Sequence, residues 1–303
     1  MKTNRASNTA GYTAAMRAIA NLAPENKKVL IDPYAMEFMD FPWSLTHPLF
    51  KLKIFNPLIF QIGTKVPDIM VGFPGMTALA SIRHRYIDER IVAAYQQGIR
   101  QFFILGAGYD SRAFRLPLQD AHFFEIDHPN TQARKQDIVH KRKLQASCSI
   151  EYISSDFSFS WADDLFDQLK KIDTFRQEPS MVIWEGVSCY LSPKAVSYTF
   201  KTVSHFLPPE SIFIFDVFPK EIMNPKTHNR LIKKMQFMVE RKGEPFYWGA
   251  DPDELEQTLL NERFSKVSSH SLFDINNALA KKGKSKLKPY DILHYLNMIE
   301  CQK

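Results

Sequence analysis

The stretch Phe102-Phe103-Ile104-Leu105-Gly106-Ala107-Gly108-Tyr109-Asp110-Ser111-Arg112 decides the fold of this chain. An apolar run of strand length enters a Gly-x-Gly turn, where the backbone can approach a bound molecule closely before a helix begins. The next apolar run ends in Asp127, 21 positions after Gly106. A carboxylate at this place can accept hydrogen bonds from the hydroxyls of a ribose. The order of strand, glycine turn, helix, strand and acid therefore predicts a site for an adenosine-containing cofactor.

The residues after the second glycine bear on which cofactor this is. Dinucleotide-binding turns carry a third glycine at the position that Ser111 occupies here. Asp110 would repel a pyrophosphate at the helix N-terminus, but it suits the positive sulfonium or ammonium of S-adenosylmethionine. An NAD(P)-dependent oxidoreductase stays as the alternative, because Tyr190 and Lys194 have the Tyr-x-x-x-Lys spacing of short-chain dehydrogenases. Pro193 lies between them, so we expect a helix that begins there with Ser192 as its N-cap.

The remainder of the chain predicts an α/β fold. Apolar runs of strand length alternate with amphipathic helical stretches, which is typical of a parallel sheet with helices on both faces. Two further strands follow near the end of the chain. We therefore expect a Rossmann-like, seven-stranded, mostly parallel sheet that ends in an antiparallel pair. The expected strands are residues 101–105, 122–126, 150–154, 180–185, 211–217, 264–271 and 292–299. Residues 219–243 are expected to form mostly one further helix.

The first 79 residues read differently and predict an N-terminal helical cap or lid. Residues 13–22 have a helical pattern, and Asp32-Pro33 is a typical helix start. The apolar stretch 41–73 is cut by four prolines and by Lys51 and Lys53, so it does not predict a transmembrane helix. We expect residues 80–303 to form one compact cofactor-binding domain beneath this cap.

Composition limits the possible classes of protein. The 303 residues carry a formal net charge of +6, and the lysine-rich run 281–288 has no interleaved aromatic residues, so we expect a solvated loop rather than a nucleic-acid surface. The three cysteines are far apart and form no Cys-x-x-Cys pair. Neither a disulfide framework nor a metal site is predicted, and a reducing cytoplasm fits best. No apolar leader is visible at the N-terminus.

Several motifs together resemble the leucine carboxyl methyltransferase family, which includes polyketide O-methyltransferases. The glycine motif of residues 104–116 is similar to that of the family, as is Phe124-Glu125-Ile126-Asp127-His128-Pro129. Trp184-Glu185-Gly186-Val187-Ser188-Cys189-Tyr190-Leu191 resembles its segment after the fourth strand. Residues 82–88 resemble its basic helix, and residues 246–249 a late aromatic segment. The resemblance covers most of the chain and implies S-adenosylmethionine as the methyl donor.

The resemblance also implies roles for single residues. Gly106 and Gly108 would pass under the methionine portion of the donor, and Asp127 would bind its ribose. Glu185 would lie near its amino group and sulfonium. The remaining expected donor contacts are Asp156 and Phe157 beside the adenine, and Arg17 and Arg83, with Arg85 as its neighbour, toward the carboxylate. Taken singly, the arginines also fit surface charges and Asp156 also fits a helix cap.

The predicted reaction needs little chemistry from the protein. Methyl transfer from a sulfonium is an in-line displacement, which requires alignment and exclusion of water. A carboxylate acceptor is already anionic at pH 7, so we expect no catalytic side chain. The prediction is O-methylation of a carboxylate or hydroxyl on a small or medium organic acceptor, with methylation of a protein C-terminus as an alternative. Tyr190, Tyr247 and Trp248 are candidates for lining the acceptor pocket, although packing explains these aromatic residues equally well.

Overall fold

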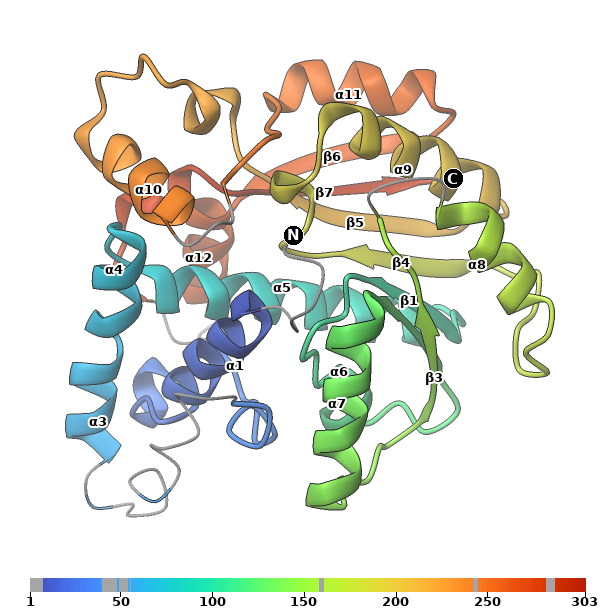
Figure 1. The fold of residues 1–303 in the computed structure, drawn as a ribbon, viewed down its shortest axis with the longest axis horizontal. Helices are drawn as coiled ribbons and strands as arrows, with labels where there is room; N and C mark the ends of the chain where they lie inside the picture. Colours follow the sequence, from blue (N-terminus) through green and yellow to red (C-terminus); the bar gives the residue numbers. More distant parts are fainter. Residues whose placement is uncertain are drawn as a thin grey trace.

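A single twisted sheet runs through the protein (Figure 1), and its strand order is β3-β2-β1-β4-β5-β7-β6. The computed structural model describes residues 8–39, 48, 54, 56–157, 161–241, 245–281 and 287–303. The first five strands are parallel, whereas β7 is antiparallel to both β5 and β6. The predicted mostly parallel α/β sheet with a final antiparallel pair is therefore confirmed. The strands are β1 (Gln101–Leu105), β2 (His122–Asp127), β3 (Ser149–Ser154), β4 (Ser180–Trp184), β5 (Ile212–Val217), β6 (Ser265–Ser271) and β7 (Asn297–Gln302).

Alternating side chains of the central strands fill two separate cores. Phe102 and Ile104 of β1 pack on one face with α5 (Met76–Gln96) and α12 (Leu272–Lys281). Phe103 and Leu105 pack on the other face with α8 (Trp161–Leu169), α9 (Pro193–Phe206) and α11 (Pro252–Asn261). Because side chains alternate along a strand, an unbroken apolar run such as β1 requires helices on both faces. This double cover explains why all five residues of β1 are buried.

The C-terminal third differs from the expected pattern in three places. Residues 291–294 form a short 3-10 helix, so the last strand begins at Asn297 rather than at residue 292. Helix α12 follows β6 directly and was not predicted from the sequence. Within the stretch 219–243, expected to be mostly one helix, α10 covers only Arg230–Arg241. The helix begins there because Oδ1 of Asn229 accepts hydrogen bonds from the backbone N–H groups of Leu231 and Ile232.

The N-terminal segment lies against α5 and the glycine turn. It contains α1 (Asn8–Asn21), a 3-10 turn at Glu25–Lys27, α3 (Asn56–Gly63) and α4 (Lys65–Val71). No helix begins at Asp32, whose Oδ1 instead accepts a hydrogen bond from the backbone N–H of Tyr34 and closes a tight turn. Much of the apolar stretch 41–73 before Asn56 lies outside the described residues. None of the helices in the described part of the chain has the length and apolar character needed to cross a bilayer.

Helices α6 (Arg112–Arg115) and α7 (Pro129–Arg142) follow β1 and β2. The turn before each helix leaves the carboxyl end of its strand, so the two turns come together at one edge of the sheet. In open parallel sheets this edge, near the point where the strand order reverses, is where ligands bind. Between β1 and β4 the order reverses here, and β1 carries the glycine turn.

Candidate functional site

The glycine turn has the conformation that the sequence predicts. Gly106 and Gly108 have φ values of +73° and +50°, in the left-handed region that glycine adopts without strain. A Cβ on Gly106 would lie 2.3 Å from Cγ2 of Val187, and one on Gly108 would lie 3.2 Å from Cβ of Ala10. The backbone N–H of Gly106 donates to the carbonyl of Ile126, which ties the turn to β2. Both glycines are thus required by backbone conformation and by close neighbours.

Asp127 ends β2 directly beside this turn. Its carboxylate accepts hydrogen bonds from the backbone N–H of Gly108 and, at 2.6 Å, from that of His128. Burial raises the pKa of Asp127, and these two N–H donors oppose that rise. The predicted separation of strand end and glycine turn has therefore brought the acid into contact with the second glycine.

Glu185 and Arg83 form the centre of a buried ion network. Oε1 of Glu185 accepts from Nε of Arg83 at 2.8 Å, and Oε2 accepts from Nη2 of Arg112 at 2.8 Å. Nη1 of Arg83 also donates to Asp216 at 2.7 Å. Burial alone would raise the pKa of Glu185, but His84, Arg112 and Arg83 outweigh it and hold that pKa well below its ordinary value. Glu185 is therefore ionised, and it is positioned by two helices and a strand.

Arg17 connects α1 to the glycine turn. Its guanidinium donates to Asp32 at 2.8 Å, to the hydroxyl of Ser111 at 2.9 Å and to the carbonyl of Tyr109 at 2.5 Å. The side chain is 2% exposed, yet its Nε has no hydrogen-bond partner among the described residues. Arg17 thus reaches the glycine turn from the N-terminal helix, and its predicted contact with the donor carboxylate stays a prediction. Arg85 does not reach it, since it pairs with Glu89 on the surface of α5.

Asp156 and Phe157 follow β3 at the same edge of the sheet. Phe157 is buried and packs edge-on against Trp161, with ring centroids 5.1 Å apart. Asp156 is exposed. Between β3 and Asp156 lies Ser155, which was not predicted. Its backbone N–H donates to the carbonyl of Asp127 at 2.8 Å, and its buried hydroxyl has no partner among the described residues.

Sequence reasoning missed most of the ion network. Arg112 is fully buried and donates to Asp88, Asp110 and Glu185. Arg115 makes a two-pronged pair with Asp88, with N–O distances of 2.6 and 2.7 Å. The signal in the sequence is Asp110 two positions before Arg112, a spacing that indicates at most a local ion pair. The local pair exists, but the partners that explain the burial of Arg112 lie 24 and 73 positions away.

The predicted aromatic residues lie close to one another but are not equivalent. The carbonyl of Cys189 accepts from the backbone N–H groups of Tyr247 and Trp248, at 2.7 and 3.3 Å. This pairing brings the segment of Tyr190 against the late aromatic segment. Tyr247 is 59% exposed. The ring of Trp248 packs on Phe200, against the core between the sheet and helices α8, α9 and α11.

Helix α9 begins as the sequence predicts. The hydroxyl of Ser192 accepts from the backbone N–H of Ala195 at 3.3 Å, and Pro193 is the first helical residue. Tyr190 lies in the preceding 3-10 turn, so Tyr190 and Lys194 do not share a helix. The arrangement required by a short-chain dehydrogenase is therefore not present.

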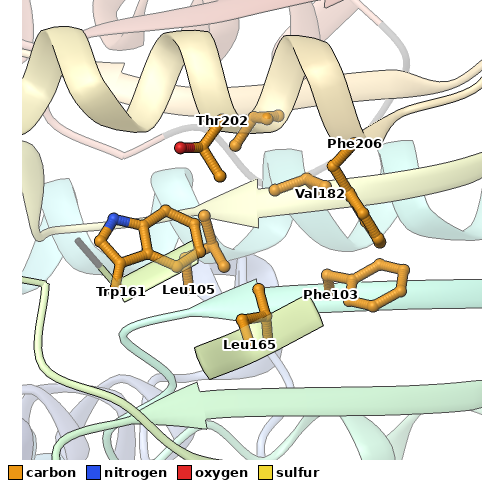
Figure 2. A pocket seen from close by; sticks show the side chains of 8 residues that line it. Phe103, Leu105, Trp161, Leu165, Val182, Thr202 and Phe206 are labelled. Carbon is orange, nitrogen blue, oxygen red and sulfur yellow. The ribbon is translucent and has the colours of Figure 1, made fainter. Parts of the chain in front are cut away.

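Two hollows in the described residues lie away from these side chains. One, shown in Figure 2, is an apolar cavity of about 10 Å³ between β1, β4, α8 and α9. It has room for about one water molecule and is a packing gap in the core. The other, of about 220 Å³, lies between Glu37, Met39 and α7. Neither hollow includes a residue predicted for the cofactor.

The residues at the edge of the sheet fit the expected methyl donor. Two buried polar atoms, Nε of Arg17 and Oγ of Ser155, have no partner within the part of the chain that the structure describes, and they lie next to the glycine turn and the end of β2. Positive and negative side chains are both present there, as a zwitterionic donor requires. Gly106 and Gly108 place no side chain of their own between the turn and its neighbours Val187 and Ala10.

Comparison with known proteins identifies the family. The family model described as leucine carboxyl methyltransferase matches residues 10–204. The chain belongs to the leucine carboxyl methyltransferase family. A putative S-adenosyl-L-methionine-dependent methyltransferase, YktD of Bacillus subtilis, is 26% identical over 270 residues, which are 87% of this chain and 86% of that protein. Another, Franean1_4929 of Parafrankia sp., is 33% identical over 138 residues, which are 45% of this chain and only 43% of that protein.

Solved structures agree with the fold of this methyltransferase family. A putative methyltransferase from Thermobifida fusca matches the whole chain and 96% of its own, with 14% identity and a TM-score of 0.55. A DUF574 family protein from Streptomyces avermitilis matches 80% of the chain and 90% of its own, with 12% identity and a TM-score of 0.55. The predicted family, enzyme class and cofactor, S-adenosylmethionine, are confirmed at the level of the family.

Proposed function

We propose that this chain is an O-methyltransferase that transfers the methyl group of S-adenosylmethionine to a carboxylate or hydroxyl of a small or medium organic acceptor. The observation that carries the proposal is a chain of contacts at one edge of the sheet. Asp127 and Arg17 contact the glycine turn directly. Glu185, paired with Arg83, is linked to the residues after the turn through Arg112. The donor supplies an electrophilic methyl group on a positively charged sulfur. The chain supplies a binding site that orients it and excludes water.

Each residue has a distinct part in this proposal. Asp127 binds the ribose hydroxyls, and Asp156 and Phe157 flank the adenine. The backbone of Gly106 and Gly108 passes beneath the methionine portion, whose carboxylate pairs with Arg83 and Arg17. Glu185 stays ionised because of the neighbouring Arg83 and Arg112, so it attracts the positive amino group and sulfonium.

The acceptor side of the proposal rests on the segment around Tyr190 and Tyr247. Tyr247 is exposed and is held by a backbone hydrogen bond to Cys189, next to the strand end that carries Glu185. We propose that Tyr190 and Tyr247 contact the acceptor and that Trp248 supports this wall from the core. A carboxylate acceptor needs no general base, so its rate of methylation should be nearly constant between about pH 6 and 8.

Calorimetric titration with S-adenosylmethionine and S-adenosylhomocysteine tests donor binding, with NAD and NADP as controls. Asp127→Ala removes the proposed ribose contact, and Glu185→Gln removes a charge while keeping the shape. Asp253→Asn, at an exposed position on α11, is the matched control. We expect binding to be lost or weakened at least tenfold in the first two variants and unchanged in the third. A folded wild-type protein that binds neither sulfur compound, or binds NAD(P) instead, would contradict the proposal.

The methylated atom is tested by the stability of the product. Panels of aliphatic acids, aromatic acids and phenols are incubated with methyl-labelled donor. A methyl ester releases methanol under mild base, whereas a methyl ether does not. Label in a peptide C-terminus but in no small molecule would instead assign the alternative, carboxyl methylation of a protein.

A further inference from the structure

Helices α3 and α4 present an apolar surface to solvent. Ile54, Leu58, Ile62 and Ile69 are 84%, 54%, 57% and 70% exposed, and we call these four residues the α3–α4 surface. Leu58 and Ile62 lie one turn apart on the same side of α3, and none of the residues of α3 is buried. The two helices run nearly end to end along one side of the molecule (Figure 1). Exposed branched apolar side chains grouped in this way mark an interaction surface.

Helices α3 and α4 carry no exposed acidic side chain. Between Asn56 and Val71 the only ionisable side chains that can carry full charge at pH 7 are Lys65 and Asp68. Oδ1 of Asp68 accepts from the backbone N–H groups of Gly75 and Met76, both at 2.9 Å, and so is used within the protein. Lys65 is exposed. The surface is thus apolar with a single positive charge.

Helix α10 adds a basic border. It lies beside α4 (Figure 1), and Cγ of Lys234 is 2.8 Å from where a Cβ of Gly72 would be. Four basic residues of α10 are exposed, against one exposed acid, Glu240. They are Arg230, Lys233, Lys234 and Arg241. Phe237 of α10 is itself 55% exposed, and the Arg241 guanidinium lies 5.5 Å from its ring centroid.

We propose that the α3–α4 surface and the basic side of α10 dock this protein on an anionic lipid bilayer. Exposed isoleucine and leucine enter the boundary between head groups and acyl chains, while lysine and arginine beside them pair with anionic head groups. This charge complementarity favours a bilayer over a second copy of the chain. In a symmetric dimer built on this surface the two basic α10 helices would border the same interface and repel each other.

The docking is peripheral and separate from the donor site. Leu58, Ile62, Arg230 and Lys233 make none of the contacts that join the glycine turn to Asp127 and Glu185. Variants at these positions should therefore keep donor binding. The failure of this inference and the failure of the proposed function are then distinguished by different measurements.

Vesicle flotation tests the inference on the whole chain. Vesicles of phosphatidylcholine with about 30% phosphatidylglycerol are compared with pure phosphatidylcholine. We expect wild-type protein to float with the anionic vesicles only, and to be released as NaCl is raised from 0.05 to 0.5 M, because salt screens the attraction. Arg230→Glu/Lys233→Glu should weaken binding at least tenfold, given about fivefold for each basic side chain near the surface. Leu58→Ser/Ile62→Ser should also weaken it at least tenfold, because two apolar side chains no longer enter the boundary between head groups and acyl chains.

The matched control is Lys170→Glu/Lys171→Glu, at exposed positions just beyond α8 and far from α3 (Figure 1). This variant should bind vesicles nearly as well as wild type. Equal binding to neutral vesicles, equal loss in the control, or no flotation of wild type would overturn the inference. So would a concentration-dependent dimer in sedimentation velocity that forms without vesicle binding and disappears in Leu58→Ser/Ile62→Ser, which would assign the surface to a second copy.

Discussion

Replacement of Arg112 by methionine should destabilise the protein more than any exposed ion pair can. Arg112 is 0% exposed, and its guanidinium is shared among Asp88, Asp110 and Glu185. Methionine has similar length but leaves these buried carboxylates without their common partner. Removing one member of a buried ion pair costs about 3–5 kcal/mol. An exposed pair contributes about 0–1 kcal/mol.

The expected change in melting temperature follows from chain length. With about 2.1 cal/mol/K of unfolding entropy for each of 303 residues, 1 kcal/mol corresponds to about 1.6 °C. Arg112→Met should therefore lower the melting temperature by about 5–8 °C, measured by circular dichroism at pH 7.5. Arg134→Met, which breaks an exposed pair with Asp137 on α7, is the control and should change it by less than about 2 °C.

The pH dependence of this effect distinguishes lost charge pairing from lost packing. In the wild type, burial raises the pKa of Asp110, but Arg112, Lys135 and Arg17 outweigh it and hold that pKa below its ordinary value. Its stabilisation is therefore present above the ordinary carboxyl pKa and is lost as the pH falls. Without Arg112 the pKa of Asp110 in the folded state rises. Protonation of Asp110 at low pH then removes an unpaired buried charge, so the variant is destabilised less. The difference in melting temperature between wild type and Arg112→Met should shrink from pH 7.5 to pH 5, and a constant difference would refute the reasoning.

Three other changes test separate parts of the structure. Gly106→Ala places a Cβ 2.3 Å from Cγ2 of Val187 at a φ of +73°. We expect urea unfolding to show about 1–3 kcal/mol of destabilisation and calorimetry to show weaker donor binding. Unchanged donor binding would contradict the close approach of the donor to this turn. Burial raises the pKa of Glu125 to about 7 despite its ion pair with Lys135. The folded protein therefore keeps this proton longer than the unfolded chain, and the stabilisation is lost as the pH rises toward and through 7. Glu125→Gln should flatten the curve of unfolding free energy against pH between about pH 5 and 8. Leu165→Ala enlarges the apolar cavity beneath α8 and should cost about 2–5 kcal/mol in urea unfolding, with donor binding unchanged.

The sequence by itself determined the central strands, the glycine turn and the acid that ends β2. These features depend on local patterns, because an apolar run buried on both faces, a backbone with positive φ and a strand-end carboxylate each leave a signal within a few residues. The start of α9 was also predictable from a local signal, since the N-cap Ser192 and the first helical residue Pro193 are adjacent. Local signals failed for α12 and for the start of β7, where short apolar stretches fit more than one kind of element.

Only the tertiary structure decided which charges are buried together. Arg17 meets Ser111 across 94 positions, and Arg112 meets Glu185 across 73. In the sequence these residues look like ordinary surface charges on helices, as Arg85 indeed is. Nothing local distinguishes Arg83 from Arg85, but residues two apart on a helix point to different sides, and only the packing of α5 on the sheet turns Arg83 toward Glu185. A buried ion network is stable only when every partner is in place, so its membership is a property of the assembled fold.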